Sequence, residues 1–199
     1  MRKVILLFAL IVSVNLFAEE KVSDYSMSYF DGKVYDVETT DVSNGEFTYY
    51  IYCETKDRHD QIGFSLKNNQ ISDFVSQLRL IKEKFIEWKK TAEDNNIKSF
   101  DKNFDVNFQS VGTFWLYGSK WCFSRVKFKP YFKVTDSGTT HVVFSAGQMK
   151  ASTNEYMTTK GFYIVFSSTE EIDSFIEAIN PTHAINKSQS DKTKQDLFK

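Results

Sequence analysis

Apolar and polar residues alternate in many short segments of the chain, and this two-residue period predicts β-strands. In 47–54 the odd positions are aromatic, aliphatic or cysteine, while the even positions are threonine, tyrosine or glutamate. Further strands are expected at 33–39, 62–66, 104–108, 113–117, 120–134, 141–151 and 161–167. Turn sequences such as Gly118-Ser119 and Asp136-Ser137-Gly138 separate some of these segments. Short turns of this kind join antiparallel strands.

Two other segments have the three- and four-residue spacing of an amphipathic helix. The first runs from about Gln70 to Glu93 and has one apolar stripe, composed of Ile71, Phe74, Val75, Leu78, Ile81, Phe85, Trp88 and Ala92. The second is short. It starts after Ser168, where Glu171 can complete a capping box, and it ends at Asn180-Pro181.

The order of strands, helix, strands and helix predicts an α+β fold. We expect a mostly antiparallel β-sheet of about seven to eight strands, with one long central helix and one short C-terminal helix packed on one face. Residues 33–181 would form this single α+β domain. Residues 19–32 would be a loose N-terminal segment, and residues 182–199, which are polar and without periodicity, a mobile polar tail.

Residues 1–18 have the three parts of an export signal: a basic start, an apolar run at 4–14 and the small residue Ala18 at the cleavage point. Leu16 fits the rule of small residues at this point only loosely. The apolar run is shorter than the ~20 residues of a membrane-spanning helix, so a cleaved signal peptide is favoured over an uncleaved anchor. No cysteine lies near Ala18. We therefore expect an exported protein, periplasmic or extracellular, that is not a lipoprotein and has no membrane span in its mature chain.

Charge and motif content disfavour several functions. The chain has 25 Lys+Arg and 26 Asp+Glu, whereas a general nucleic-acid binder should be markedly basic. It has no phosphate-binding glycine loop, dinucleotide fingerprint or nucleophile elbow. His59, His141 and His183 are far apart in sequence and lack the spacing of paired metal ligands. The sequence thus predicts no cofactor, no metal and no catalytic residue, although residues from distant segments could still assemble a catalytic site.

The two cysteines, Cys53 and Cys122, lie in the apolar register of their segments. Export would allow them to form a disulfide, which would close a loop of about 70 residues and contribute about 4 kcal/mol in the chain-entropy model. The alternative is a pair of free buried thiols. Neither cysteine has a histidine close to it in sequence, so a catalytic thiol is not expected.

Segment 120–134 has the most informative outward face. Its even positions are mostly apolar and are expected to face the core. Its odd positions include Trp121, Phe123, Arg125 and Lys127, and Tyr50 and Tyr52 have a similar outward register in 47–54. If the two segments share a sheet, these six residues form an aromatic and basic surface. Flat rings stack on sugars or on other rings, and the cations bind carboxylate or phosphate.

This pattern also has a structural interpretation. A curled sheet could close the four aromatic residues into a second small core, with the cations solvated at its rim, because large aromatic side chains are usually mostly buried. Only the exposure of these side chains distinguishes the two interpretations.

The sequence favours an exported, non-enzymatic binding or interaction domain. The candidate ligands are an anionic glycan, a lipid head group or an acidic partner such as an envelope or extracellular protein. Two alternatives stay open: an extracytoplasmic hydrolase whose site is assembled from distant segments, and a structural protein of the cell envelope.

Overall fold

The computed structural model describes residues 20–40, 42–57 and 61–197. The signal peptide predicted at 1–18 lies outside these residues, so export stays a prediction. Among the described helices, none combines the length and the apolar character that a membrane crossing requires.

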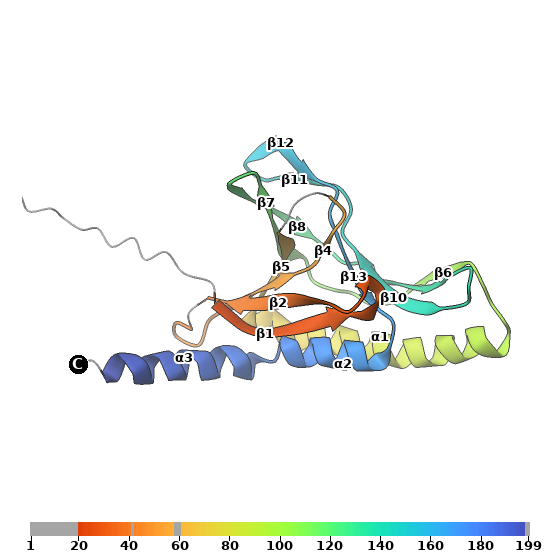
Figure 1. Cartoon of the computed structure of the whole chain (residues 1–199), viewed down its shortest axis with the longest axis horizontal. Coiled ribbons are helices and arrows are strands. Elements are labelled where there is room, and N and C mark those ends of the chain that lie inside the picture. Colours follow the sequence, from red (N-terminus) through yellow and green to blue (C-terminus); the bar gives the residue numbers. More distant parts are fainter. Residues whose placement is uncertain (1–19, 41, 58–60, 198–199) are drawn as a thin grey trace, which may run out of the picture.

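The strands form two antiparallel sheets and a separate hairpin (Figure 1). The six-stranded sheet has the order β1 (Glu20–Met27), β2 (Lys33–Thr39), β3 (Thr48–Tyr52), β5 (Ile62–Lys67), β7 (Val111–Tyr117) and β8 (Lys120–Val126). The five-stranded sheet has the order β4 (Glu54–Thr55), β13 (Phe162–Phe166), β10 (Thr140–Ser145), β9 (Tyr131–Val134) and β6 (Phe100–Asn103). The hairpin consists of β11 (Met149–Ala151) and β12 (Asn154–Thr159). The predicted α+β class with antiparallel strands is confirmed.

The number of strands is larger than predicted, thirteen in three sheets instead of seven to eight. The chain passes directly, with no helix between, from the six-stranded to the five-stranded sheet at Cys53, between β3 and β4, and again through residues 127–130, between β8 and β9. The predicted strand 120–134 is therefore two strands in different sheets. Pro130 lies in the second crossing and has no N–H to offer a ladder. The predicted strand 104–108 is not a strand; β6 lies just before it.

Helix α1 (Asn68–Asp94) contacts both sheets and matches the predicted span Gln70–Glu93 within two residues at each end. Its Phe74 ring stacks on Phe64 of the six-stranded sheet, with ring centroids 5.7 Å apart. About three turns further along the helix, Phe85 contacts Phe132 of the five-stranded sheet, with ring centroids 6.0 Å apart. The apolar stripe read from the sequence thus joins the two sheets.

Helix α2 (Thr169–Ala178) begins where the capping box predicts. Ser168 Oγ accepts from the Glu171 backbone N–H at 3.3 Å. The Glu171 carboxylate reaches one residue further back than in a simple capping box, because it accepts from the N–H of Ser167 at 2.6 Å and from that of Ser28 at 2.8 Å. This side chain therefore also connects α2 to the short 3-10 helix η1 (Ser28–Phe30).

Both terminal segments are more regular than the sequence indicates. Residues expected to be a loose N-terminal segment include β1, which pairs with β2 and buries Tyr25 and Met27. Residues expected to be an irregular tail form helix α3 (Pro181–Asp196). This helix is anchored at its start, because the Tyr49 hydroxyl donates to the Asn180 carbonyl at 2.7 Å and accepts from the Ala184 N–H at 3.2 Å. Lys187 adds ion pairs to Glu20 and Asp191.

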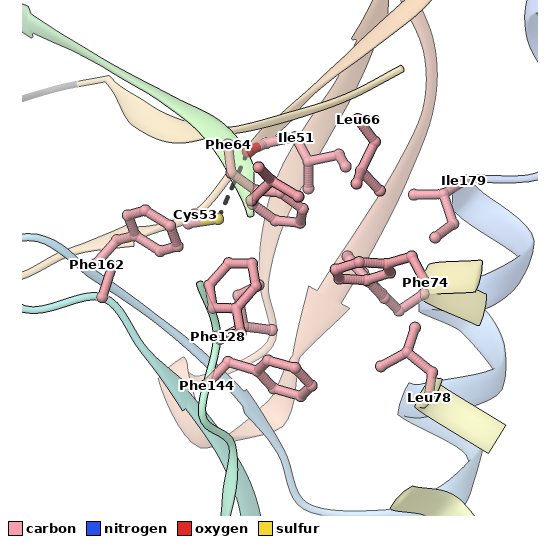
Figure 2. Close-up of a cluster of buried hydrophobic side chains, with 14 of the residues drawn as sticks. Ile51, Cys53, Phe64, Leu66, Phe74, Leu78, Phe128, Phe144, Phe162 and Ile179 are labelled. Atoms are coloured by element: carbon pink, nitrogen blue, oxygen red, sulfur yellow. Dashed lines mark hydrogen bonds between the residues drawn. The ribbon is translucent and has the colours of Figure 1, made fainter. Parts of the chain in front are cut away.

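The buried core lies where the two sheets and α1 meet (Figure 2). Phe128, in the crossing between β8 and β9, lies at its centre and is 1% exposed. Its ring contacts five other rings, with centroids 5.2–6.3 Å apart: Phe64, Phe74, Phe108, Phe144 and Phe162. These partners come from both sheets, from α1 and from the segment before β7, so one side chain holds the layers together.

Candidate functional site

The strand register brings the predicted aromatic and basic residues of β3 and β8 onto one face of the six-stranded sheet. Residues paired across an antiparallel sheet share a face. One row across β3, β5, β7 and β8 consists of Tyr52, Gly63, Phe114 and Phe123. The next row consists of Tyr50, Ser65, Gly112 and Arg125. We call the side of this sheet that bears Tyr50, Tyr52, Trp121, Phe123 and Arg125 the aromatic–basic face.

Phe114 lies on the same face, buried among the neighbouring rings, and the sequence analysis did not predict its role. It is 3% exposed although it does not belong to the main core cluster. Its ring lies over Gly63, where an added Cβ would be 2.7 Å from Phe114 Cζ. Tyr50, Tyr52 and Trp121 contact the same ring, with centroids 5.4, 5.2 and 5.8 Å away. Gly63 was the signal for this contact in the sequence, because a glycine in a strand leaves space that a large ring on the neighbouring strand can occupy.

The exposure of the aromatic residues supports both interpretations in part: some rings form a small core, and others remain on the surface. Phe114 and the half-buried Tyr50 and Tyr52 form a small satellite cluster. Trp121 and Phe123 lie at its edge and stay 43% and 50% exposed. Because these two rings lie on the same side of one strand, they form an exposed apolar patch, and contiguous patches are informative where single exposed residues are not.

The two predicted cations lie beside these exposed rings. Arg125 is exposed, and its guanidinium donates to the Ser110 carbonyl at 2.8 Å and weakly to Ser110 Oγ at 3.4 Å. This contact holds one edge of the guanidinium and fixes its position on the sheet. Lys127 is also exposed, but it follows the end of β8 and lies in the crossing to the second sheet. Within the described chain, no carboxylate oxygen comes within 4.0 Å of Lys127 Nζ.

The tyrosine end of the aromatic–basic face has a different charge. The Tyr52 hydroxyl donates to Glu38 at 3.0 Å. Burial raises the pKa of the Glu38 carboxyl, and neighbouring Asp36 raises it further. A hollow of about 230 Å³ next to Tyr52 is lined by both carboxylates and by Lys33. The structure thus places Tyr52 beside acidic groups, with two strands between it and Phe123, so the acidic groups and the predicted cations lie at opposite ends of this face.

The cations of the β8 end belong to a larger basic region. Strands β7 and β8, with the crossing that follows them, and the β11–β12 hairpin project together, away from the helices (Figure 1). We call residues 111–129 and 147–161 the distal lobe. All of its residues are described, and they include six exposed cations, Lys120, Arg125, Lys127, Lys129, Lys150 and Lys160, but one carboxylate, Glu155. The chain as a whole has a net charge of −1, so positive charge is concentrated in this lobe.

Both cysteines are buried free thiols. Cys53 lies in the main core, where the Tyr25 hydroxyl approaches its Sγ at 3.9 Å. Cys122 lies within the distal lobe, at the edge of the same core, with its Sγ 3.9 Å from Met157 Sδ. The structure therefore has the two thiols in different surroundings rather than the disulfide that export would allow. Burial raises the pKa of both thiols, which disfavours the reactive thiolate.

Two serines have a basic partner, as the hydrolase alternative requires. Lys56 Nζ donates to Ser145 Oγ at 2.5 Å and to the Ala146 carbonyl at 2.8 Å, and it lies 3.9 Å from the centre of the Tyr163 ring. Burial lowers the pKa of Lys56. The carbonyl and the ring both interact best with an ammonium ion, whereas a general base must be neutral. The arrangement is that of a structural lysine.

The second pair is His141 and Ser167, whose Nδ1 and Oγ are 3.0 Å apart. Glu171 lies close to the pair, but its carboxylate already accepts the backbone N–H groups of Ser167 and Ser28. The His141 side chain is 5% exposed and makes an edge contact with Tyr29 at 4.9 Å. Tyr29 thus packs against the imidazole, while Ser167 is half-buried.

His141 gives the fold a pH dependence that can be measured. Burial lowers the pKa of its imidazole from 6.5, and Lys133 lowers it further, while Glu171 partly opposes the shift. The unfolded chain therefore binds a proton at this histidine at a higher pH than the folded chain does. The free energy of unfolding should fall as the pH decreases below about 6.5.

The measurement is urea unfolding at pH 7.5 and pH 5.5 for the wild type and for His141→Gln, which keeps a hydrogen-bonding side chain next to Ser167. The variant should lose less stability than the wild type between the two pH values. Equal losses would show that another group is responsible for the pH dependence.

Other evidence about function is limited to this geometry. The described residues contain no group of three or more histidine, cysteine, aspartate or glutamate side chains placed to hold a metal ion. Comparison of the chain with models of protein families, with curated proteins and with solved structures found no match.

Proposed function

We propose that this chain is an exported, non-enzymatic binding domain that holds an anionic ligand at the β8 end of the aromatic–basic face. Trp121 and Phe123 would contact the apolar or ring part of the ligand. Arg125 and Lys127 would bind its carboxylate, sulfate or phosphate groups. The proposal of export rests on the leader sequence at 1–18.

One observation carries this proposal: exposed large rings and exposed cations lie side by side on a supported surface. Phe114 fills the space under the rings, so Trp121 keeps its position without a ligand. The Ser110 carbonyl does the same for Arg125. A site whose side chains are already in place loses less entropy when it binds.

The structural alternative, assembly through sheet edges, has less support. β8 is an edge of the six-stranded sheet, but the Ser152 N–H from the β11–β12 hairpin donates to the Phe123 carbonyl at 2.8 Å. The opposite edge, β1, is contacted by α2 and α3. These two covered edges oppose strand addition by another chain, and assembly would have to use another edge, such as the exposed β6 of the five-stranded sheet.

The test is charge reversal at the two cations. Arg125→Glu together with Lys127→Glu should weaken capture of an anionic ligand by about 100-fold or more, because two charge-assisted contacts become repulsive. The melting temperature should stay within a few degrees of the wild type, since both side chains are exposed. Capture is measured on immobilised acidic polysaccharide, anionic vesicles and acidic peptide.

A matched control removes the same charge elsewhere. Lys98 follows α1 and Lys192 lies on α3; both are exposed and outside the distal lobe. Lys98→Glu with Lys192→Glu should leave capture within about twofold of the wild type at physiological salt, where distant charges are screened. Equal capture by the Arg125/Lys127 variant and the wild type on every surface would contradict the proposal.

A further inference from the structure

The end of the distal lobe has exposed aromatic residues on both of its hairpins. Tyr117 and Trp121 stand on either side of the Gly118-Ser119 turn, 42% and 43% exposed. Tyr156, in β12, is 84% exposed, the highest value among the large hydrophobic residues that the structure describes. Tyrosine and tryptophan combine an apolar ring with a polar group, and this combination is typical of residues that lie at the boundary between lipid and water.

The same two hairpins also carry exposed lysines. Lys120 follows the β7–β8 turn, and Lys150 lies in β11 of the second hairpin. Within the described residues, no carboxylate oxygen lies within 4.0 Å of Lys120 Nζ, and the one carboxylate of the lobe, Glu155, is 3.9 Å from Lys150 Nζ. Exposed rings and cations on the same two hairpins suit the layers of an anionic bilayer, where phosphates lie outside the acyl chains.

The two hairpins form one preformed unit. The Ser152 N–H donates to the Phe123 carbonyl, which joins the second hairpin to β8. Below them, Cys122 lies against Met157, and Thr113 Oγ1 approaches Met149 Sδ at 3.4 Å. The two hairpins are thus fixed to each other, and their exposed rings need no folding transition to reach a surface.

The shape of the lobe favours a surface over a small ligand. Strand ends and hairpin turns project at this end of the molecule (Figure 1). Larger hollows lie elsewhere: one of about 400 Å³ beside Ser72 and Ile176, and one of about 450 Å³ beside Lys89 and Ser168. Small molecules and single sugar chains bind best in concave sites, whereas a projecting tip can enter a flat interface.

We propose that the distal lobe docks on a membrane that contains anionic phospholipid, with Trp121 and Tyr156 in the interfacial layer and Lys120 and Lys150 at the phosphates. This inference rests on the proposed function, because it specifies the anionic ligand as a lipid head group in a bilayer. Acidic polysaccharides and acidic proteins are the competing ligands.

The experiment uses the processed chain, residues 19–199, which contains all of the described structure. Its binding to vesicles of phosphatidylcholine with about a third of phosphatidylglycerol is measured by cosedimentation. We expect binding that disappears on pure phosphatidylcholine. Lys120→Glu with Lys150→Glu should weaken it by at least tenfold, as each basic residue near an anionic surface contributes about a factor of five. The control Lys98→Glu with Lys192→Glu should bind like the wild type.

Fluorescence locates the contact. Trp115 is fully buried and Trp88 is packed against the core, so the exposed Trp121 should dominate any change on vesicle binding. The emission should shift to shorter wavelength when vesicles are added, and Trp121→Phe should abolish the shift while cosedimentation persists. An unchanged spectrum with full cosedimentation would overturn the proposed orientation of the lobe.

Competing ligands keep this inference distinct from the proposed function. Absence of vesicle binding, with capture on acidic polysaccharide or peptide that depends on Arg125 and Lys127, would overturn the membrane inference and leave the proposed function in place. Absence of capture on every anionic surface would overturn both.

Discussion

Replacing Phe128 by alanine should lower the free energy of unfolding by about 3–5 kcal/mol, which is the usual cost of removing a fully buried phenyl ring. The loss should be at the upper end of this range, because the ring touches partners from both sheets and α1, and these elements cannot all move into the cavity together. Urea unfolding monitored by far-UV circular dichroism gives the value. A loss below 1 kcal/mol would show that the two sheets are not held together at this point.

Phe123→Ala is the matched control for this experiment. It makes the same chemical change five residues earlier, on a side chain that is 50% exposed. Its cost should stay within about 1 kcal/mol, because a half-exposed ring loses little transfer free energy on truncation. The difference between the free energies of unfolding of the two variants therefore measures how much the burial of Phe128 contributes to stability.

Replacing Gly161 by alanine should destabilise the fold by about 2–5 kcal/mol, from left-handed backbone strain and steric overlap together. Gly161 has φ +93°, and a Cβ there would lie 2.1 Å from the Ala146 carbonyl oxygen and 2.4 Å from that of Gly147. Both oxygens belong to the backbone and cannot rotate away. The measurement is again the free energy of unfolding in urea.

Gly138→Ala is the control that separates backbone strain from steric overlap. It has nearly the same backbone angle, φ +90°, but an added Cβ would meet nothing within 4 Å. Gly138→Ala should therefore cost about 1–2 kcal/mol, from strain alone. Equal costs at both positions would mean that the chain around Ala146 moves aside without difficulty, contrary to our expectation.

The sequence predicts the regular interior of this fold well because the pattern is long there. Helix α1 has eight apolar positions at helical spacing, so its identity does not depend on any single residue. Strand β2 matches the predicted 33–39 in full. The Asp136-Ser137-Gly138 turn follows from local chemistry, since glycine supplies the positive φ that the turn needs.

The crossings between sheets leave no sign in the pattern. Cys53 is buried, and the alternation of β3 continues through it into β4, although the partner strands change. Likewise, the even positions stay buried across the crossing from β8 to β9: Cys122, Phe128 and Phe132 are all buried. The periodicity records which side of a strand is buried but not which sheet buries it, so the strand count came out too low.

The terminal elements were missed because distant parts of the chain stabilise them. β1 is mostly polar and has two buried residues near its end, so its stability comes from β2 and α2. Helix α3 has no apolar stripe, but Asn180 Oδ1 accepts from the Thr182 N–H at 3.1 Å and Pro181 occupies the first helical position. Asn-Pro marks the start of a helix as well as the end of one, and this signal was present in the sequence.

The candidate site, too, could be predicted from the sequence only in part. The outward direction of Trp121, Phe123 and Arg125 follows from the two-residue period, and the structure places all three on an exposed face. The role of Phe114 depends on its pairing with Gly63 and Phe123, which requires the strand order. The basic lobe is also a three-dimensional property, since its two hairpins are separate in sequence.

The position of β13 affects how the chain reaches its native state. This strand lies between β4 and β10, and its Phe162 pairs with Thr55, so early and late parts of the sequence must meet to complete the second sheet. Such non-local pairing slows folding to times on the order of milliseconds to seconds. During synthesis, the five-stranded sheet cannot close until most of the polypeptide has been made, so the earlier strands of this sheet must wait unpaired with β13 until the last quarter of the chain appears.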